Sequence, residues 1–138
     1  MTVYLDTSVV LRVLTGQPGA WDGWAQWESA YSSDLLGLEA RRTIDRMRVE
    51  RALDSEAVAL AQEALAVIES SIGRIPLSRL LLTRAALPMA VAVKTLDAIH
   101  LASALRLAEV RRKPVLFVTH DAKQALAART LGFSCAGI

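Results

Sequence analysis

The chain has 138 residues, of which 53% are hydrophobic and 22% are charged. A chain of this length is expected to form one domain, residues 1–138, and its composition excludes intrinsic disorder. The formal net charge is only +2, which permits a nucleic-acid partner without arguing for one.

Neither membrane association nor secretion is expected. The longest apolar runs, such as Leu87 to Val93, are far shorter than the roughly 20 residues that a membrane-spanning helix needs. The first residues, MTVYLD, have neither the basic region nor the long apolar segment of a secretory signal. The single cysteine, Cys135, cannot form an internal disulfide, which fits a reducing compartment. We therefore expect a cytoplasmic protein.

The first part of the chain predicts two strands and two helices. Val3 to Leu5 is expected to be a short buried strand, after which the sequence DTS supplies the capping side chains of a helix from Val9 to Leu14. Ala30 to Ser33 is the second predicted strand. Between them, three tryptophans recur every third residue, which predicts a short helix with all of them on one side: Trp21, Trp24 and Trp27.

Two longer helices follow. The first runs from Asp34 or Leu35 to Leu53 and carries one apolar stripe, with Glu39 at its edge. The second begins after Asp54, its expected N-cap, and continues to about Ser71. Ile75 to Leu77 then predicts a strand that contains a proline, which places it at an edge of the sheet. Residues 78–86 are expected to be helical, and Pro88 interrupts the pattern.

The last third of the chain alternates helices and strands. A helix is expected from about Thr95 to Val110, a strongly apolar strand from Val115 to Thr119, a helix from Ala122 to Leu131 and a final strand from Phe133 to Ala136. Strands separated by single helices or helical pairs imply parallel strands joined by right-handed crossovers. The sequence therefore predicts an α/β fold, a three-layer α/β/α sandwich around a mostly parallel sheet of about four or five strands.

Four carboxylates fall at places where such a sheet builds its sites. Asp6 ends the first strand, Glu39 lies in the helix after the second, Asp97 opens the helix before the fourth, and Asp121 follows that strand. Open parallel sheets bind ligands at the carboxyl ends of their strands, especially where the strand order reverses. If the first and fourth strands are neighbours at that reversal, Asp6 and Asp121 face one crevice, and the helix opened by Asp97 points to the same edge.

Each carboxylate also has a purely structural interpretation. Asp6 and Asp121 can cap helices, and Gln124 stands at the capping-box spacing from Asp121. Asp97 is favoured by the dipole of its helix, and Glu39 can form an ion pair with Arg42.

A cluster of carboxylates would have a distinct chemistry. Converging carboxylates repel one another, so that either some of them protonate or a divalent cation neutralises them. Oxygen ligands without a cluster of cysteine or histidine favour Mg²⁺ or Mn²⁺ over Zn²⁺. A site of this kind suits the hydrolysis of phosphodiesters.

Four segments resemble, in order and spacing, the acidic motifs of PIN-domain ribonucleases and, more narrowly, of the VapC-type toxins of prokaryotic toxin–antitoxin modules. The segments are YLDTSVVLRVL, GLEARR, LDAIHLASAL and FVTHD, and the match spans essentially the whole chain. This resemblance implies a PIN-like sandwich, endonucleolytic cleavage of RNA that depends on Mg²⁺ or Mn²⁺, a homodimer, and inhibition by a cognate antitoxin protein.

The resemblance also implies roles for particular residues. Asp6 and Asp97 look like the principal metal ligands. Glu39 and Asp121 look like the other acidic members, which bind the metal directly or through water and help to position the nucleophile. Small hydroxyl residues often stand beside the first and last acids of the family, and Ser8 and Thr119 occupy those places here. Their implied role is to orient the carboxylates.

Several residues near the motifs have two interpretations each. His100, one turn beyond Asp97, is either a general base or a packed histidine, and the same choice applies to His120. The tryptophans either stack nucleobases or pack between helices or at a protein interface. A set of cations either contacts phosphates along a groove that leads to the acids or is structural: Arg41, Arg42, Lys94, Arg111, Arg112 and Lys113.

Other functions compete with that of a nuclease. A phosphatase that forms an aspartyl-phosphate on Asp6 would usually have a second aspartate two residues on, where this chain has Ser8. The P-loop sequence GxxxxGK followed by Ser or Thr does not occur. The non-enzymatic alternative is a PIN-like module whose acidic pocket binds RNA or an antitoxin without cleavage.

Overall fold

The computed structural model describes the whole chain, residues 1–138, as five strands and six helices. The strands form one sheet in the order β3-β2-β1-β4-β5, and every neighbouring pair is parallel. The strands are β1 (Thr2–Leu5), β2 (Ser29–Ser33), β3 (Gly73–Ile75), β4 (Val115–Val118) and β5 (Ser134–Ala136). The predicted α/β class with a parallel sheet is confirmed.

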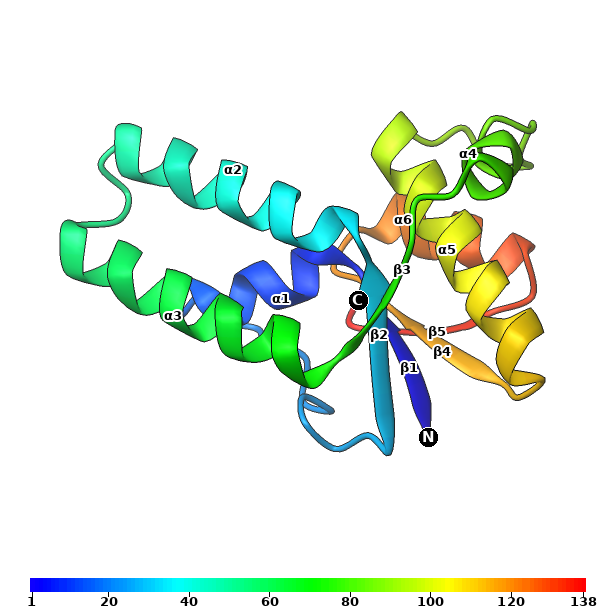
Figure 1. Ribbon diagram of the computed structural model, residues 1–138, viewed down its shortest axis with the longest axis horizontal. Helices are drawn as coiled ribbons and strands as arrows, with labels where there is room; N and C mark the ends of the chain where they lie inside the picture. The colour runs from blue at the N-terminus through cyan, green and yellow to red at the C-terminus, as the bar shows by residue number, and fades with distance from the viewer.

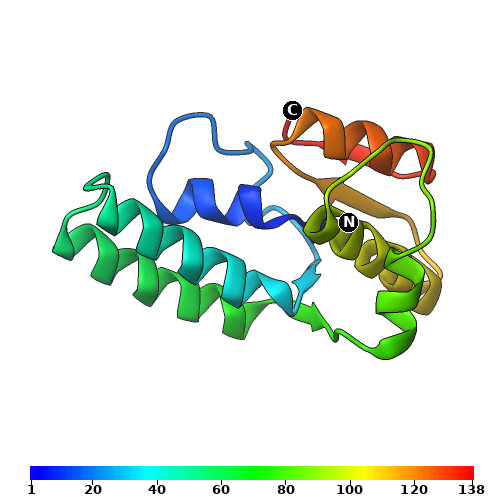
Figure 2. The ribbon, with the colours of Figure 1, turned by 90° about the horizontal axis from the view of Figure 1, so that it is seen from above.

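Helices cover both faces of this sheet, as Figures 1 and 2 show. One side carries α1 (Thr7–Leu14), α2 (Leu35–Val49) and α3 (Ser55–Ser71), of which the last two form a hairpin that extends beyond the sheet. The other side carries α4 (Arg79–Ala85), α5 (Thr95–Arg111) and α6 (Ala122–Thr130). The predicted three layers are therefore present. No helix is both long enough and apolar enough to span a membrane.

The central strand β1 divides the hydrophobic core between the two sides. Val3 and Leu5 join the cluster that α1, α2 and α3 complete, whereas Tyr4 stacks on Phe117 in the cluster under α5 and α6. All three β1 side chains are fully buried. Successive side chains of a strand point to opposite faces, and a central parallel strand is covered on both, which explains the uninterrupted apolar sequence.

The strand order reverses between β1 and β4. The chain leaves β1 toward β2 and β3 on one side, then crosses to β4 and β5 on the other. At the carboxyl ends of the central strands, the backbone N–H of Asp6 donates to the carbonyl oxygen of Val118 at 2.9 Å. Asp6 and Thr119 therefore leave the sheet side by side, at the edge where α1, α5 and α6 begin. Parallel sheets build ligand sites at such an edge.

The predicted helix around the three tryptophans is wrong. Residues 22–25 form a turn, and Ala25 has a left-handed backbone with φ 63°. Gly23 lies so close to the Trp21 ring that a Cβ on it would be 2.2 Å from the ring, which a regular helix would not allow. The ring of Trp27 stacks on Trp21 and meets Trp24 edge to face, and all three indoles pack against the core beside α1. Their packing interpretation is therefore the one the structure supports.

The observed boundaries of α2 and β3 differ from the predicted ones by a few residues. α2 ends at Val49 rather than at Leu53, because Arg51 adopts a left-handed φ of 60°. β3 covers Gly73–Ile75 rather than Ile75–Leu77, so that its proline lies outside the strand. Its predicted position at an edge of the sheet is nevertheless confirmed.

Candidate active site

Asp6 is held at the end of β1 by a set of neutral donors. Its Oδ2 accepts hydrogen bonds from the backbone N–H and the hydroxyl of Ser8, and the Thr119 hydroxyl lies 3.2 Å from the same oxygen. Its Oδ1 accepts from Nε2 of Gln124 at 3.2 Å. Asp6 is only 6% exposed. It caps α1 as predicted, and its carboxylate is at the same time fixed at the carboxyl edge of the sheet.

Gln124 is a member of this site that the sequence alone did not reveal. The capping-box interpretation would turn its side chain back toward the N–H of Asp121. Instead, that N–H donates to the Thr119 hydroxyl, and Gln124, fully buried, links Thr119 to Asp6. The signal that could have identified it is a polar side chain on the buried face of α6, among alanines.

Ser8 and Thr119 tie the ends of β1 and β4 together. The hydroxyl of Ser8 binds Asp6 and also accepts from the backbone N–H of His120 at 3.1 Å, just beyond β4. The Ser8 and Thr119 hydroxyls are 3.4 Å apart. Both residues thus contact the first acid.

Asp121 lies beside this group but is more exposed. Its Oδ1 accepts from the backbone N–H groups of Lys123 and Gln124 at 2.8 and 3.0 Å, so that it caps α6 as predicted. Its second oxygen has no hydrogen-bond partner within the protein.

Glu39 reaches the same edge from the opposite layer. Its Oε1 lies 2.6 Å from Nε2 of His100 and accepts from the Thr7 hydroxyl at 2.8 Å. The Nδ1 of His100 is 2.8 Å from the Tyr4 hydroxyl. His100 is 1% exposed and Tyr4 is fully buried. The alternative ion pair with Arg42 does not form, because Arg42 binds Asp45 instead.

Asp97 lies in the first turn of α5 and makes no side-chain hydrogen bond within the protein. Partial burial raises its pKa, and the charges of Asp6, Asp121 and Glu39 raise it further, whereas the charge of His100 partly opposes them. Charges act on one another in this way only when they are close. All four predicted acids therefore contribute to one electrostatic environment, although the sequence places them up to 115 residues apart.

The pKa of His100 is also displaced by its surroundings. Burial lowers it, but the hydrogen bond to Glu39 and the charges of Asp6, Glu39 and Asp97 together outweigh that effect, so that the pKa is raised. Nε2 of His100 lies 3.7 Å from Asp6 Oδ1. His100 is thus a packed histidine that nevertheless contacts the acidic residues.

The predicted cationic groove does not form as a set. Arg41 pairs with Glu69 on α3, and Arg42 pairs with Asp45. Arg111, Arg112 and Lys113 lie at the far end of α5, where Lys113 lines a cavity with Met1 and Thr2 at the amino ends of the strands. A helix of 17 residues separates its ends by about 25 Å. Two exposed lysines do flank the acidic edge, at the starts of α5 and α6: Lys94 and Lys123.

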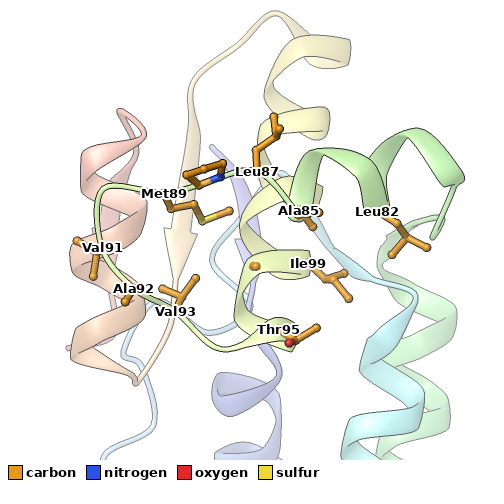
Figure 3. A pocket seen from close by; sticks show the side chains of 12 residues that line it. Leu82, Ala85, Leu87, Met89, Val91, Ala92, Val93, Thr95 and Ile99 are labelled. Atoms are coloured by element: carbon orange, nitrogen blue, oxygen red, sulfur yellow. The ribbon is translucent and has the colours of Figure 1, made fainter.

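An apolar cavity of about 500 Å³ borders the first turns of α5 (Figure 3). It lies between α4, the start of α5 and the segment that joins them, and that segment contributes Met89, Val91 and Val93. Thr95 is its one polar side chain, and none of the four acids lines it. The cavity is therefore a neighbour of the acidic edge and not part of it.

The chain matches the family model of the PIN domain over residues 3–129, and it therefore belongs to the PIN-domain family. No curated protein matches it. PIN domains are generally metal-dependent nucleases, so the family agrees with the position of the acids at the carboxyl edge of the sheet.

The donor set of this edge fits a hard divalent cation bound largely through water. No group of three or more His, Cys, Asp or Glu side chains is close enough to hold a metal ion by itself. Mg²⁺, however, usually keeps several waters and takes only one or two carboxylates from a protein. Besides burial, repulsion by the neighbouring acids raises the pKa of Asp97, and such a cation would relieve this repulsion. Asp6 and Asp97 could hold it, with Glu39 and Asp121 near by.

Proposed function

We propose that this PIN-domain protein is an endoribonuclease that depends on Mg²⁺ or Mn²⁺, and that it is the VapC-type toxin of a type II toxin–antitoxin module. The observation that supports this most is the electrostatic convergence of Asp6, Glu39, Asp97 and Asp121 at the point where the strand order reverses. Although Asp6 and Asp121 also cap helices, holding four carboxylates near one another costs electrostatic free energy in the folded state. A bound divalent cation would offset this repulsion, which explains why the carboxylates lie together.

In this proposal Asp6 and Asp97 are the metal ligands. Ser8, Thr119 and Gln124 hold the Asp6 carboxylate in one orientation, so that it need not be ordered when a cation binds. Glu39 and Asp121 position a water for attack on the scissile phosphate and accept its proton. The cation, when bound, supplies Lewis acidity and screens the charge of the phosphate.

The proposal includes a homodimer and a cognate antitoxin, which the resemblance to VapC toxins implies. Exposed apolar side chains of α4 and the segment after it are compatible with such contacts. Leu80 is 83% exposed and Leu87 is 60% exposed. Analytical ultracentrifugation of the purified chain would detect the dimer.

The decisive test compares Asp6→Asn and Asp97→Asn with the wild type. Both variants are expected to lose Mg²⁺- or Mn²⁺-dependent RNA cleavage while keeping the fold, whereas Glu63→Gln, an exposed carboxylate of α3, is expected to retain it. Sequencing of RNA ends after controlled expression would report both the activity and the target. In the purified protein, Mg²⁺ should raise the midpoint of thermal unfolding for the wild type but not for Asp97→Asn. Unchanged cleavage in both Asn variants would reject the proposed site.

The second candidate is a PIN-like module that binds RNA or an antitoxin without cleaving RNA. One observation favours it: both oxygens of Asp6 already have hydrogen-bond donors, and no complete metal-binding group is preformed. Absence of cleavage by the wild type with every divalent metal tried, together with retained binding, would support this candidate.

A further inference from the structure

Two buried side chains, Tyr4 and His100, connect the core to the partly exposed Glu39. The Tyr4 hydroxyl lies 2.8 Å from Nδ1 of His100, and Nε2 of His100 lies 2.6 Å from Oε1 of Glu39. Tyr4 comes from the central strand, His100 from α5 in one layer, and Glu39 from α2 in the other. This chain of hydrogen bonds thus joins both helical layers at the end of β1.

When the imidazole of His100 is neutral, the chemistry of the groups fixes the direction of the hydrogen bonds in this chain. A carboxylate oxygen only accepts, so Nε2 of His100 must carry the proton that is donated to Glu39. A neutral imidazole has one N–H, which leaves Nδ1 as an acceptor. The Tyr4 hydroxyl must then donate to Nδ1, and burial, which raises the pKa of that hydroxyl well above its usual range, keeps it protonated. Both donors therefore point toward the acidic edge.

We propose that Tyr4 and His100 are positioning residues for Glu39: Tyr4 holds the imidazole as the Nε2–H form, and His100 in turn clamps Oε1 of Glu39. The Thr7 hydroxyl supplies a second donor to the same oxygen. Oε1 is then fully engaged, and Oε2, which has no partner within the protein, remains available at the crevice. The consequence for catalysis rests on the proposed nuclease function, whereas the arrangement of protons does not.

The other histidine provides an internal control. Nδ1 of His120 lies 2.6 Å from the backbone carbonyl oxygen of Gly137, and a carbonyl oxygen only accepts. His120 is therefore expected to carry its proton on Nδ1, opposite to His100. The chain has only these two histidines, so each can be assigned by replacing the other.

Two-bond proton–nitrogen spectra of the imidazole rings would test the proton arrangement in the metal-free protein. At alkaline pH, where the imidazole is neutral, His100 should appear as the Nε2–H form and His120 as the Nδ1–H form. Tyr4→Phe should shift the Nδ1 resonance of His100, which loses its donor, and leave His120 unchanged. A wild-type His100 that carries its proton on Nδ1, or one that does not respond to Tyr4→Phe, would overturn the proposal whether or not the protein cleaves RNA.

Cleavage assays would then test the positioning role. His100→Leu should lower the cleavage rate about 10- to 100-fold, the usual effect of losing a residue that orients a metal-site carboxylate. His100→Gln, which keeps a side-chain N–H near the place of Nε2, should recover part of that loss. Tyr4→Phe should reduce cleavage in the wild-type background and have no further effect in His100→Leu. The positioning role would be overturned if His100→Leu and His100→Gln lost equal amounts of cleavage activity. It would also be overturned if Tyr4→Phe had the same effect in the wild type and in His100→Leu. Matching circular dichroism spectra would show that each variant folds.

Discussion

Replacing Glu39 by alanine should destabilise the metal-free protein, even though the change removes one member of a cluster of like charges. Two donors would lose their acceptor, Nε2 of His100 and the hydroxyl of Thr7, which lie 2.6 and 2.8 Å from Oε1. His100 is 1% exposed and Thr7 is 4% exposed, so water cannot readily replace the carboxylate. Each unsatisfied buried donor costs about 1–3 kcal/mol.

Two effects reduce this cost. The Thr7 oxygen lies 3.2 Å from Nε2 of His100, so it can accept the proton that Glu39 no longer receives, and one of the two penalties is largely avoided. The loss of the Glu39 charge also relieves Asp97, but Glu39 contributes least among the charges that act on the pKa of that residue. The remaining penalty of one donor, about 1–3 kcal/mol, is therefore expected to dominate.

Urea unfolding of the metal-free protein, analysed by linear extrapolation, would measure the difference in free energy of unfolding between the wild type and Glu39→Ala. Asp45→Ala is the matched control, because Asp45 lies on the same helix and is 43% exposed, with Arg42 and Arg48 as its partners. Exposed ion pairs contribute only about 0–1 kcal/mol, so this variant should unfold close to the wild type. If Glu39→Ala were no less stable than Asp45→Ala, the hydrogen bonds from His100 and Thr7 to Glu39 would not contribute to the free energy of unfolding, and the prediction would be wrong.

Two further predictions concern pH and RNA. The pKa of His100 is raised in the folded state, so the folded protein holds this proton more tightly and its free energy of unfolding should fall as the pH rises from about 6.5 through the folded-state value. Glu39→Gln removes the main cause of the raised pKa, and urea titrations at several pH values should then show a shallower decline. Lys94→Ala and Lys123→Ala, combined with Asp97→Asn to prevent cleavage, should each reduce the slope of log K against log salt for RNA binding by about 0.7. Arg111 lies at the opposite edge, so Arg111→Ala should leave that slope unchanged. A lower slope for Arg111→Ala, with unchanged slopes for the two lysine variants, would contradict the placement of RNA at the acidic edge.

The fold was largely predictable because its signals are local and the rules of chain connection are strict. Val3–Leu5 and Val115–Thr119 are apolar runs bounded by polar residues, and helices between strands force parallel pairing. Once the strands are parallel, Asp6 and Asp121 must leave the sheet at the same edge. The turn around Trp24 was not predictable in the same way, because a three-residue spacing of indoles is satisfied equally by a helix and by a compact loop that packs them.

The partners of the acids were less predictable than the acids themselves. Gln124 has the spacing of a capping residue, and only the approach of α6 to the end of β1 shows that it binds Asp6. Tyr4 looks like an ordinary core aromatic until α5 brings His100 within 2.8 Å of its hydroxyl. The position of Arg111 was also not predictable from the sequence alone. Arg111 shares a helix with Asp97, but the length of that helix carries it to the other edge of the sheet.

The hydrogen bonds that hold Asp6 come from neutral donors, and this has a consequence for cation binding. Hydroxyls, an amide and a backbone N–H hold Asp6, and no arginine or lysine forms an ion pair with any of the four acids. A nearby guanidinium would orient the oxygens equally well, but it would also neutralise the charge that attracts a cation. Neutral donors fix the oxygens and leave their negative charge in place. Burial raises the pKa of Asp97 in the metal-free protein, and repulsion by the neighbouring acids raises it further. A divalent cation at the edge would relieve that repulsion, which favours its binding.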